Sequence, residues 1–573
     1  MIVSQTENVG LETTHQQPHI VAAVGEDEDY LKWKPAREEL LILACLAIVS
    51  LVVALDATIL VPVLPTIASD LHGDTNESFW VGTAYLLSCA VFQPLFVALS
   101  TVFGRQSILF LSLVLFTAGT LICCLSHGMT QLLVGRTVQG VGGAGILCLT
   151  FVITTDIIPL RQRPAYSSII QVAFVVGTVT GPVIGGLLID HSTWRWVFYL
   201  NFPFMGVGLI MVPWVVNLRR PRQDGLTQQL RSIDWVGALL FIASVSSFLI
   251  GITWGGGQFP WSSWRTLLPI FLGVAGVIVT VFWLWKGARK PFLRLSLFRD
   301  VSSGMIYLCA VLQGLLMFCE LYSLPLYLEG PKDMSPTMTG VALMTITGSL
   351  MPASVLAGII ITKFGHIRWA IWMGWVIITM STGLLILLDN DTKTYAWVLI
   401  FLSVGLGHGC IIVSSSICVQ ALAEARDSAQ AASMYTFLRS CGMCLGVAVG
   451  TSVVQNQLRH QLQIRHLPVE IAENAQIFIA SLKNAKPSYS ASFIYAVNSA
   501  YVHSLKTLFE VLVAVAGVGL IAALFLKPVN MNKRLDTQHG LQQRDRLDSG
   551  VQKRITVDER NVLRPDQTYS NSV

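Results

Sequence analysis

Residues Val175–Asp190 read V-V-G-T-V-T-G-P-V-I-G-G-L-L-I-D. The glycines of this stretch are Gly177, Gly181, Gly185 and Gly186. The first three recur every four residues and therefore line one face of a helix, where the absence of side chains lets a second helix approach closely. Pro182 lacks an N–H group and crowds the carbonyl of Thr178, so we expect the helix to bend there. The stretch indicates two helices that slide or rock against each other, and ordinary tight packing is the alternative.

The composition is that of a protein that crosses a membrane many times. Of 573 residues, 53% are hydrophobic and 12% are charged, about half the charged share of soluble domains. The net charge of +5 is small and gives no reason to expect a nucleic-acid partner. A span requires about 20 apolar residues. We predict fourteen spans, all helical, near residues 40–63, 78–99, 106–126, 130–155, 165–189, 196–217, 233–253, 266–285, 302–328, 337–361, 369–388, 394–419, 431–455 and 508–526.

Basic residues predict how the chain is oriented. With the N-terminus in the cytoplasm, the inner loops hold fifteen Lys and Arg residues and the outer loops hold nine. Because cytoplasmic loops carry the excess of basic residues, both tails, 1–38 and 527–573, are predicted to be cytoplasmic. Glycosylation sequons at Asn76 and Asn390 then fall on outer loops. We expect a monomer in the plasma membrane, with the vacuolar membrane as the alternative location.

A short repeat predicts two related halves. Thr101-Val102-Phe103-Gly104 follows the second predicted span, and Thr362-Lys363-Phe364-Gly365 follows the tenth. Such an echo indicates a parallel duplication of six spans. The predicted parts are an N-terminal six-helix bundle (39–218), two inserted linker helices (219–300) and a C-terminal six-helix bundle (301–526) with a long outer loop (456–507). Within this loop, residues 469–482 are amphipathic and predict a surface helix.

Two ionisable residues are predicted at the same depth in the first half. Asp56 lies about 24 Å from the inner face, and Arg136 lies roughly 9 Å below the outer face. In an apolar core about 30 Å thick these levels nearly coincide, so the two side chains can pair across a polar cavity. A carboxylate beside a cation is poised to exchange a proton with solvent. The alternative is a static ion pair that fixes helix packing.

The second half also places polar residues within spans. Glu320 is predicted either to carry a second proton or to attract a cationic ligand, and the alternative is that it reaches the outer interface. We expect Arg439 to be an anchor at the inner face and His408 to be a buried packing residue. The side chains expected to line a substrate pocket are Gln139, Asn201, Gln313, Tyr322 and Tyr327.

The sequence predicts neither catalysis nor a bound cofactor. All eleven cysteines lie within apolar runs, so neither a disulfide framework nor a zinc site is expected. Cys441 and Cys444 have redox spacing but lie in a predicted span, where we interpret them as packing residues. The sequence contains no nucleophile–base set, metal cluster or phosphate loop, so we do not expect an enzyme. The predicted coupling ion is the proton, and no metal is expected.

Four motifs resemble the major facilitator superfamily, and within it the fourteen-span drug:proton antiporters abundant in fungi. They are Leu55-Asp56-Ala57-Thr58-Ile59 followed by Leu64-Pro65, Arg136-Thr137-Val138-Gln139-Gly140, residues 177–186, and residues 194–203. The resemblance implies the major facilitator fold, in which two six-helix bundles, here with two linker helices, rock around a central site. It also implies proton-coupled efflux of small, largely apolar organic compounds, with the arginine of the second motif in proton coupling.

One loop departs from the family pattern. The pattern begins with Gly and has an acidic residue before Phe-Gly-Arg, where this chain has Val97 and Thr101, while Gly104 and Arg105 are retained. The family's acidic residue helps to close the inner gate by charge. Threonine can cap a helix but carries no charge. The resemblance therefore implies a weaker inner latch, or one that relies on Arg105 and helix ends.

The direction of transport rests on the resemblance, because no residue reveals it. An importer, such as a siderophore–proton symporter, is the alternative within the same fold. A non-transporting membrane receptor is the third possibility. The expected partners are a small-molecule substrate and the lipid bilayer.

Overall fold

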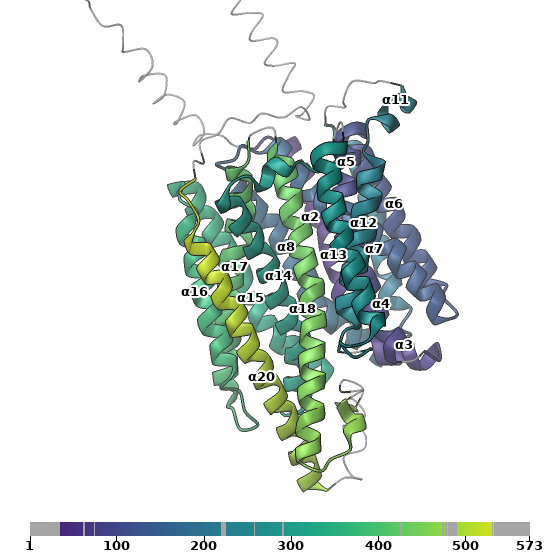
Figure 1. Ribbon diagram of the computed structural model, residues 1–573, viewed down its shortest axis with the longest axis vertical. Coiled ribbons are helices and arrows are strands. Elements are labelled where there is room, and N and C mark those ends of the chain that lie inside the picture. Colours follow the sequence, from purple (N-terminus) through teal and green to yellow (C-terminus); the bar gives the residue numbers. More distant parts are fainter. Residues whose placement is uncertain are drawn as a thin grey trace, which may run out of the picture.

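The computed structural model describes residues 35–529 and Met531, except for residues 61–62, 74, 219–224, 257, 289–290, 425–426, 473–474, 476–477 and 480–489. Helices make up nearly all of this part of the chain (Figure 1). Most of the two predicted tails lies outside the described residues. The prediction of an all-helical protein with many membrane spans is confirmed.

The helices between residues 37 and 215 form the first bundle. They are α2 (Arg37–Ile59), α3 (Leu64–Asp70), α4 (Thr75–Val91), α5 (Gln93–Phe103), α6 (Arg105–Cys124), α7 (Met129–Ile157), α8 (Arg163–His191), α9 (Trp196–Tyr199) and α10 (Asn201–Val215). Helices α4 and α5 are two parts of one broken span, bent by 44°. Pro94 lies in the first turn of α5 and has no N–H group to donate to the preceding turn, which explains the break.

The inserted helices lie against both bundles. This region contains α11 (Leu226–Arg231), α12 (Trp235–Trp254), α13 (Trp264–Phe282), η1 (Trp283–Gly287) and η2 (Leu295–Phe298). Trp254, at the end of α12, meets Trp80 of the first bundle edge to face, with ring centroids 6.3 Å apart. The hydroxyl of Ser452, in the second bundle, donates a hydrogen bond to the carbonyl of Gly255 at 2.7 Å. The end of α12 therefore connects the two bundles.

The second bundle follows from residue 301. Its helices are α14 (Val301–Glu329), α15 (Pro336–Phe364), α16 (Arg368–Leu385), α17 (Thr394–Leu422), α18 (Ser428–Ile464) and α20 (Ala491–Leu524). In both bundles the repeat seen in the sequence ends a helix at a glycine with positive φ. Gly104 ends α5 with φ of 91°, and Gly365 ends α15 with φ of 73°. Glycine adopts these positive φ values without steric cost.

The outer loop is shorter than predicted. Helix α18 has 37 residues and α20 has 34, so only residues 465–490 separate them rather than residues 456–507. In Figure 1 these two helices project beyond the others at the end opposite the grey terminal traces. Polar residues continue the helices past the apolar run, which hydropathy alone assigns to a loop. Of the surface helix predicted at residues 469–482, the structure describes the single turn η4 (Val469–Ala472). Most of the remaining residues lie outside the described ones.

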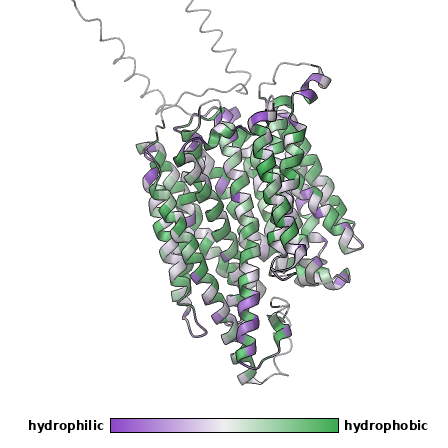
Figure 2. Cartoon of the chain, in the orientation of Figure 1, coloured by the Kyte–Doolittle hydropathy of each residue, from purple (hydrophilic) through white to green (hydrophobic). Residues whose placement is uncertain are grey.

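Among the described residues, twelve helices are long and apolar enough to cross a membrane, and the bent α4–α5 pair makes a thirteenth if it is one span. Apolar residues cover the middle of the helices, while hydrophilic ones gather at α11 and on the projecting part of α18 (Figure 2). Helix α16 occupies the remaining predicted run near 369–388 with 18 residues, and it is not among the thirteen. The count of fourteen spans thus stays a prediction.

Candidate functional site

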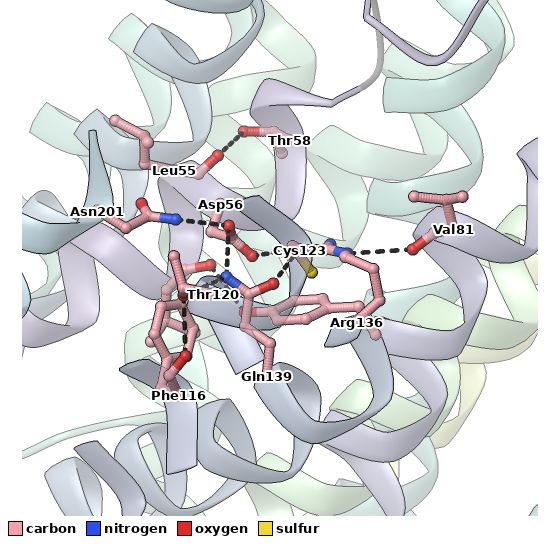
Figure 3. A network of polar contacts seen from close by, with 12 residues as sticks. Leu55, Asp56, Thr58, Val81, Phe116, Thr120, Cys123, Arg136, Gln139 and Asn201 are labelled. Atoms are coloured by element: carbon pink, nitrogen blue, oxygen red, sulfur yellow. Dashed lines mark hydrogen bonds and ion pairs between the residues drawn. The ribbon is translucent and has the colours of Figure 1, made fainter. Parts of the chain in front are cut away.

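A buried network of polar side chains connects four helices of the first bundle (Figure 3). Asp56 of α2 accepts hydrogen bonds from Arg136 (2.6 Å), Gln139 (2.9 Å) and Asn201 (2.8 Å). Arg136 and Gln139 lie on α7, and Asn201 lies on α10. The amide of Gln139 also donates to Thr120 of α6 at 2.9 Å. All five side chains belong to residues that are 0% exposed.

The guanidinium of Arg136 has several further partners. It donates from Nη1 to Oε1 of Gln139 at 2.6 Å and from Nε to the carbonyl of Val81 at 3.1 Å. Its Cζ lies 4.2 Å from the centroid of the Tyr85 ring. A buried ion pair is favourable only when hydrogen bonds also satisfy its remaining polar groups. These contacts satisfy most of the N–H groups of Arg136 without water.

Asp56 and Arg136 therefore meet, but inside one bundle rather than across a polar cavity. Both residues are 0% exposed, so the described residues enclose the pair completely in this conformation. Close packing of α7 explains the enclosure. A Cβ at Gly119 of α6 would lie 2.6 Å from Cα of Gln139, and one at Gly140 would lie 3.1 Å from Cα of Tyr85. Helices that close around a pair in this way leave no room for solvent.

The glycine face of α8 packs against α2 of the same bundle. A Cβ at Gly177 would lie 2.9 Å from the backbone N of Leu55, and one at Gly181 would lie 3.0 Å from that of Ile59. A Cβ at Gly185 would also touch the carbonyl of Ile59. The close approach that the spacing predicts is present, and the helix packed against this glycine face is α2.

The other side of α8 faces the second bundle. A Cβ at Gly340 of α15 would lie 2.7 Å from the side chain of Val183, and one at Gly186 would lie 3.7 Å from Oγ1 of Thr337. Helix α8 is therefore packed between α2 and α15, with its small residues divided between the two sides. Gly186 belongs to the interface between bundles, unlike the other three glycines of the stretch.

Pro182 leaves one carbonyl of α8 without its usual partner. The carbonyl of Thr178 would normally accept from the N–H four residues later, which proline lacks. The hydroxyl of Thr58 on α2 lies 3.0 Å from this oxygen and donates to it. Thr58 is two residues from Asp56, so the helix that carries the carboxylate is hydrogen-bonded to α8 at its proline.

The second bundle contains a comparable row of polar side chains. Glu320 of α14 accepts from the hydroxyl of Thr382 on α16 at 2.9 Å and pairs with Nε2 of His408 on α17 at 3.0 Å. Nδ1 of His408 lies 3.2 Å from the amide of Gln313, whose Oε1 accepts from Nε of Arg439 on α18 at 3.0 Å. Glu320 is 2% exposed and lies within the bundle rather than at the outer interface.

Two expectations about this row are wrong. His408 is not only a packing residue, because it contacts Glu320 directly. Arg439 is not an anchor at the inner face, because it lies eleven residues into α18, about 17 Å from the start of the helix, and is 6% exposed. The two residues are 88 apart along the chain, and nothing in the local sequence of His408 identifies it as a partner of Glu320.

The residues predicted to line a pocket have different surroundings. Gln139, Asn201 and Gln313 are fully buried in the two polar networks. The hydroxyl of Tyr327 donates to the carbonyl of Asp389 at 2.9 Å and so joins α14 to the loop after α16. Tyr322 is the member that lies among apolar side chains at the interface between bundles, where its ring stacks on that of Phe318.

This apolar group at the interface is here called the interbundle cluster. It consists of Val175, Met317, Phe318, Leu350, Ile412, Met443 and Val447, with Leu86, Val179 and Tyr322 packed against it. Leu86 comes from α4, Val175 and Val179 come from α8, and the others come from the second bundle. Both bundles contribute to the cluster, so it is the apolar surface that separates when they move apart.

The inner latch keeps a charge despite Thr101. Nε of Arg105 lies 3.1 Å from Oδ2 of Asp156, near the end of α7, and both side chains are 5% exposed. Nη1 of Arg105 also donates to the hydroxyls of Ser100 (2.6 Å) and Thr101 (3.2 Å). The inner latch, weaker or reliant on Arg105 and helix ends, stays a prediction, and the structure adds the carboxylate of Asp156 as a partner of Arg105. Asp156 follows directly on an apolar run, so its local sequence does not identify it as the partner of Arg105.

Hydrogen bonds also cross between the bundles near this inner end. Arg161 donates from Nε to the carbonyl of Thr362 at 2.8 Å. Nη1 of Arg163 donates to Oε1 of Gln420 (3.0 Å) and to the hydroxyl of Ser428 (2.7 Å). In this conformation the end of the molecule that carries the latch is closed by contacts between the two bundles.

The two sequons lie in different bundles. Asn390 is in the loop between α16 and α17, where its carbonyl accepts from Nζ of Lys332 at 2.6 Å. The side chain of Asn76 is outside the described residues. Glycosylation at both positions stays a prediction.

All eleven cysteines are free, as expected for packing residues.

The shape of the molecule is similar to that of a solved transporter structure. The chain is similar to the human organic anion transporter MFSD10 (TETRAN), with a TM-score of 0.52 and 15% sequence identity, over 84% of this chain and 100% of the other. At this level of identity the similarity shows the fold alone.

Sequence comparison gives a closer relationship. The family model described as Major Facilitator Superfamily matches residues 46–447. The MFS transporter L2 of Phoma sp. is 39% identical over 517 residues, which cover 90% of this chain and 86% of the relative. The MFS-type efflux pump LUC4 of Fusarium sp. is 32% identical over 532 residues, which cover 91% of this chain and 93% of the relative. On this evidence, together with its helical architecture, the chain belongs to the major facilitator superfamily.

Proposed function

We propose that this protein is a proton-coupled efflux transporter of small, largely apolar organic compounds, working by alternating access in the plasma membrane. Relatives that are named efflux pumps favour export over import or a receptor role. The observation that carries the proton-coupled part is the sealed pair of Asp56 and Arg136. An ion pair without access to solvent in one conformation can exchange its proton only when the helices around it move.

Protonation of Asp56 removes the charge that balances Arg136. A buried cation without a counter-charge costs several kcal/mol, so the neutral carboxyl favours a conformation in which Arg136 reaches solvent or another acceptor. Oδ1 accepts from Gln139 and Asn201 and can keep these bonds when a proton is on the other oxygen. The change is then confined to the contact between Oδ2 and Nη1 of Arg136.

Movement at Asp56 has a direct route to the interface between bundles. Asp56 and Thr58 lie on α2, and Thr58 is hydrogen-bonded to α8 at the carbonyl of Thr178. The opposite side of α8 packs against α15. A shift of α2 therefore moves the surface of α8 that contacts the second bundle. The interbundle cluster then becomes accessible from one side of the membrane or the other.

The second bundle supplies a further proton site in this proposal. The Glu320–His408 pair joins a carboxylate to an imidazole, a side chain that can also accept a proton. Glu320 carries the second proton, and His408 links it to the row that ends at Arg439. The coupling ion is the proton, and the mechanism requires no cofactor.

Export of the neutral lipophilic dye Nile red from yeast cells lacking their own drug pumps tests the proposal. We expect export to fall at least tenfold when an uncoupler removes the proton gradient, and Asp56→Asn to lose this dependence while remaining at the cell surface. Glu38→Gln, at an exposed carboxylate on the same helix, is the control and keeps the wild-type dependence. Asp56→Asn with the wild-type dependence on the gradient would remove Asp56 from the mechanism.

A further inference from the structure

Among the described residues, four arginines are buried: Arg105, Arg136, Arg163 and Arg439. The first two contact a carboxylate, Asp156 and Asp56 respectively. Arg163 has four oxygen acceptors, which are the side chains of Gln420 and Ser428 and the carbonyls of Ile158 and Thr155. Three of these four arginines are therefore compensated by charge or by several dipoles.

Arg439 is compensated much less. Its Nε donates to Oε1 of Gln313 at 3.0 Å, and its Nη2 lies 3.8 Å from the sulfur of Met317. No described residue accepts a hydrogen bond from its Nη1, and no ion pair among the described residues includes it. The carboxylate that is joined to it, Glu320, lies two side chains away and is already bonded to Thr382 and His408.

The position of Arg439 is at the surface where the bundles meet. Its Cζ lies 6.0 Å from the ring centroid of Phe174 on α8, in the other bundle. Met317, which its Nη2 touches, is a member of the interbundle cluster, and Met443 lies one turn further along the same helix. The charge therefore lies beside apolar side chains of both bundles, about a third of the way along α18.

A static structural role does not account for this arrangement. Burying a guanidinium without a counter-charge is costly, and a neutral side chain such as methionine or glutamine would pack α14 against α18 more cheaply. Intramembrane cations that face a central interface are functional residues by default. An anion placed near Nη1 would supply the missing charge.

We propose that Arg439 is the subsite for an anionic group of the substrate, and that the compounds bound most tightly are amphipathic anions with an apolar body and a carboxylate or an equally acidic enol or phenol. The inference rests on the proposed function, since it places the substrate at the cluster that opens between the bundles. The apolar body occupies the interbundle cluster, and the anionic group pairs with the guanidinium in a bidentate fashion, as arginine and carboxylate prefer.

The alternative of a cationic substrate drawn to Glu320 has less support. Glu320 is 2% exposed and is held between α16 and α17, away from the cluster. Arg439, whose sign is opposite, contacts Met317 of the cluster through its Nη2. The row from Glu320 through His408 and Gln313 places the proton site and the anion site in one bundle.

Equilibrium binding tests the proposal without any proton gradient, so its outcome is independent of the proposed coupling. The probes are pyrenebutyrate, its uncharged methyl ester, and pyrenebutylammonium, bound to the purified full-length protein in nanodiscs and followed by fluorescence anisotropy. We expect the carboxylate to bind at least tenfold more tightly than the ester, which corresponds to about 1.4 kcal/mol. We expect the ammonium probe to bind more weakly than the ester.

Arg439→Gln should reduce the ratio between carboxylate and ester to near one and leave the affinity for the ester unchanged within twofold. Gln313→Glu, which places a carboxylate against Nε of Arg439, should also remove the preference, and it serves if Arg439→Gln does not fold. Arg459→Gln, at an exposed position on the same helix, is the control and keeps the wild-type ratio.

Two results would overturn the proposal. One is a wild-type protein that does not bind the carboxylate more tightly than the ester, including one that does not bind it up to its solubility limit. The other is a preference for the carboxylate that persists in both Arg439→Gln and Gln313→Glu. Proton-coupled export of neutral compounds would remain possible after either result.

Discussion

The hydrogen bond from Thr58 to the carbonyl of Thr178 should be needed only because residue 182 is proline. We predict that Thr58→Val destabilises the protein, and that the same substitution has little effect when Pro182 is replaced by alanine. Alanine restores the N–H that pairs with the carbonyl of Thr178 inside α8. The second substitution thereby takes over the role of the hydroxyl.

The expected size follows from the burial of the two groups. Thr58 is 2% exposed and Thr178 is 4% exposed, so the freed carbonyl has no access to water. A buried polar group that loses its partner costs about 1–3 kcal/mol. The hydroxyl also lies near the carbonyls of Ala54 (3.2 Å) and Leu55 (3.4 Å), but these accept backbone bonds within α2 and lose little. We expect an interaction free energy of about 1–2 kcal/mol between the two substitutions.

Equilibrium unfolding in mixed micelles of a mild detergent and SDS, followed by tryptophan fluorescence, measures the four variants of this cycle. Thr137→Val, at an exposed threonine on α7, is the control and should change the free energy of unfolding by less than about 0.5 kcal/mol. Equal destabilisation by Thr58→Val in the proline and alanine backgrounds would refute the reasoning, because the carbonyl of Thr178 would then have another partner.

Two further predictions concern packing and the inner latch. Gly181→Leu should abolish Nile red export without loss of surface expression, because its side chain would push Thr58 and Ile59 of α2 away. The control, Gly206→Leu, should export normally, because nothing lies near its Cβ position. Normal export by Gly181→Leu would show that the contact between α8 and α2 yields easily. Asp156→Asn should lower the free energy of unfolding by about 3–5 kcal/mol, since it leaves Arg105 buried without its carboxylate. Adding Thr101→Asp should recover most of this loss, because Thr101 already contacts the same guanidinium at 3.2 Å, and a double variant no more stable than Asp156→Asn would show that the two positions are not equivalent.

The sequence predicts the helical membrane architecture well because hydropathy determines which segments can enter lipid. It also predicts that Asp56 and Arg136 lie at one depth, since the rise of a helix converts residue number into height. Depth does not determine whether water reaches a pair. The enclosure of Asp56 depends on how closely α4 and α6 approach α7 and how closely α10 approaches α2, and this closeness is a property of the packed bundle.

Periodicity likewise shows that a helix has a close-packed face without showing which helix packs on it. The glycines at 177, 181 and 185 pack against α2 rather than against the opposite bundle. Charge partners are missed for a similar reason. Asp156 and His408 are ordinary in their local sequences, and their roles come from Arg105 and Glu320, which are 51 and 88 residues away along the chain.

The short connection at the end of α12 has a mechanical consequence. Trp254 contacts the first bundle at Trp80, and one residue later the carbonyl of Gly255 is bonded to Ser452 of the second bundle. When the bundles swing apart at this end, one of these two contacts must break, and the inserted pair travels with the bundle whose contact survives. In the proposed alternating-access cycle, the inserted pair thus holds this end closed until one of the two contacts is lost.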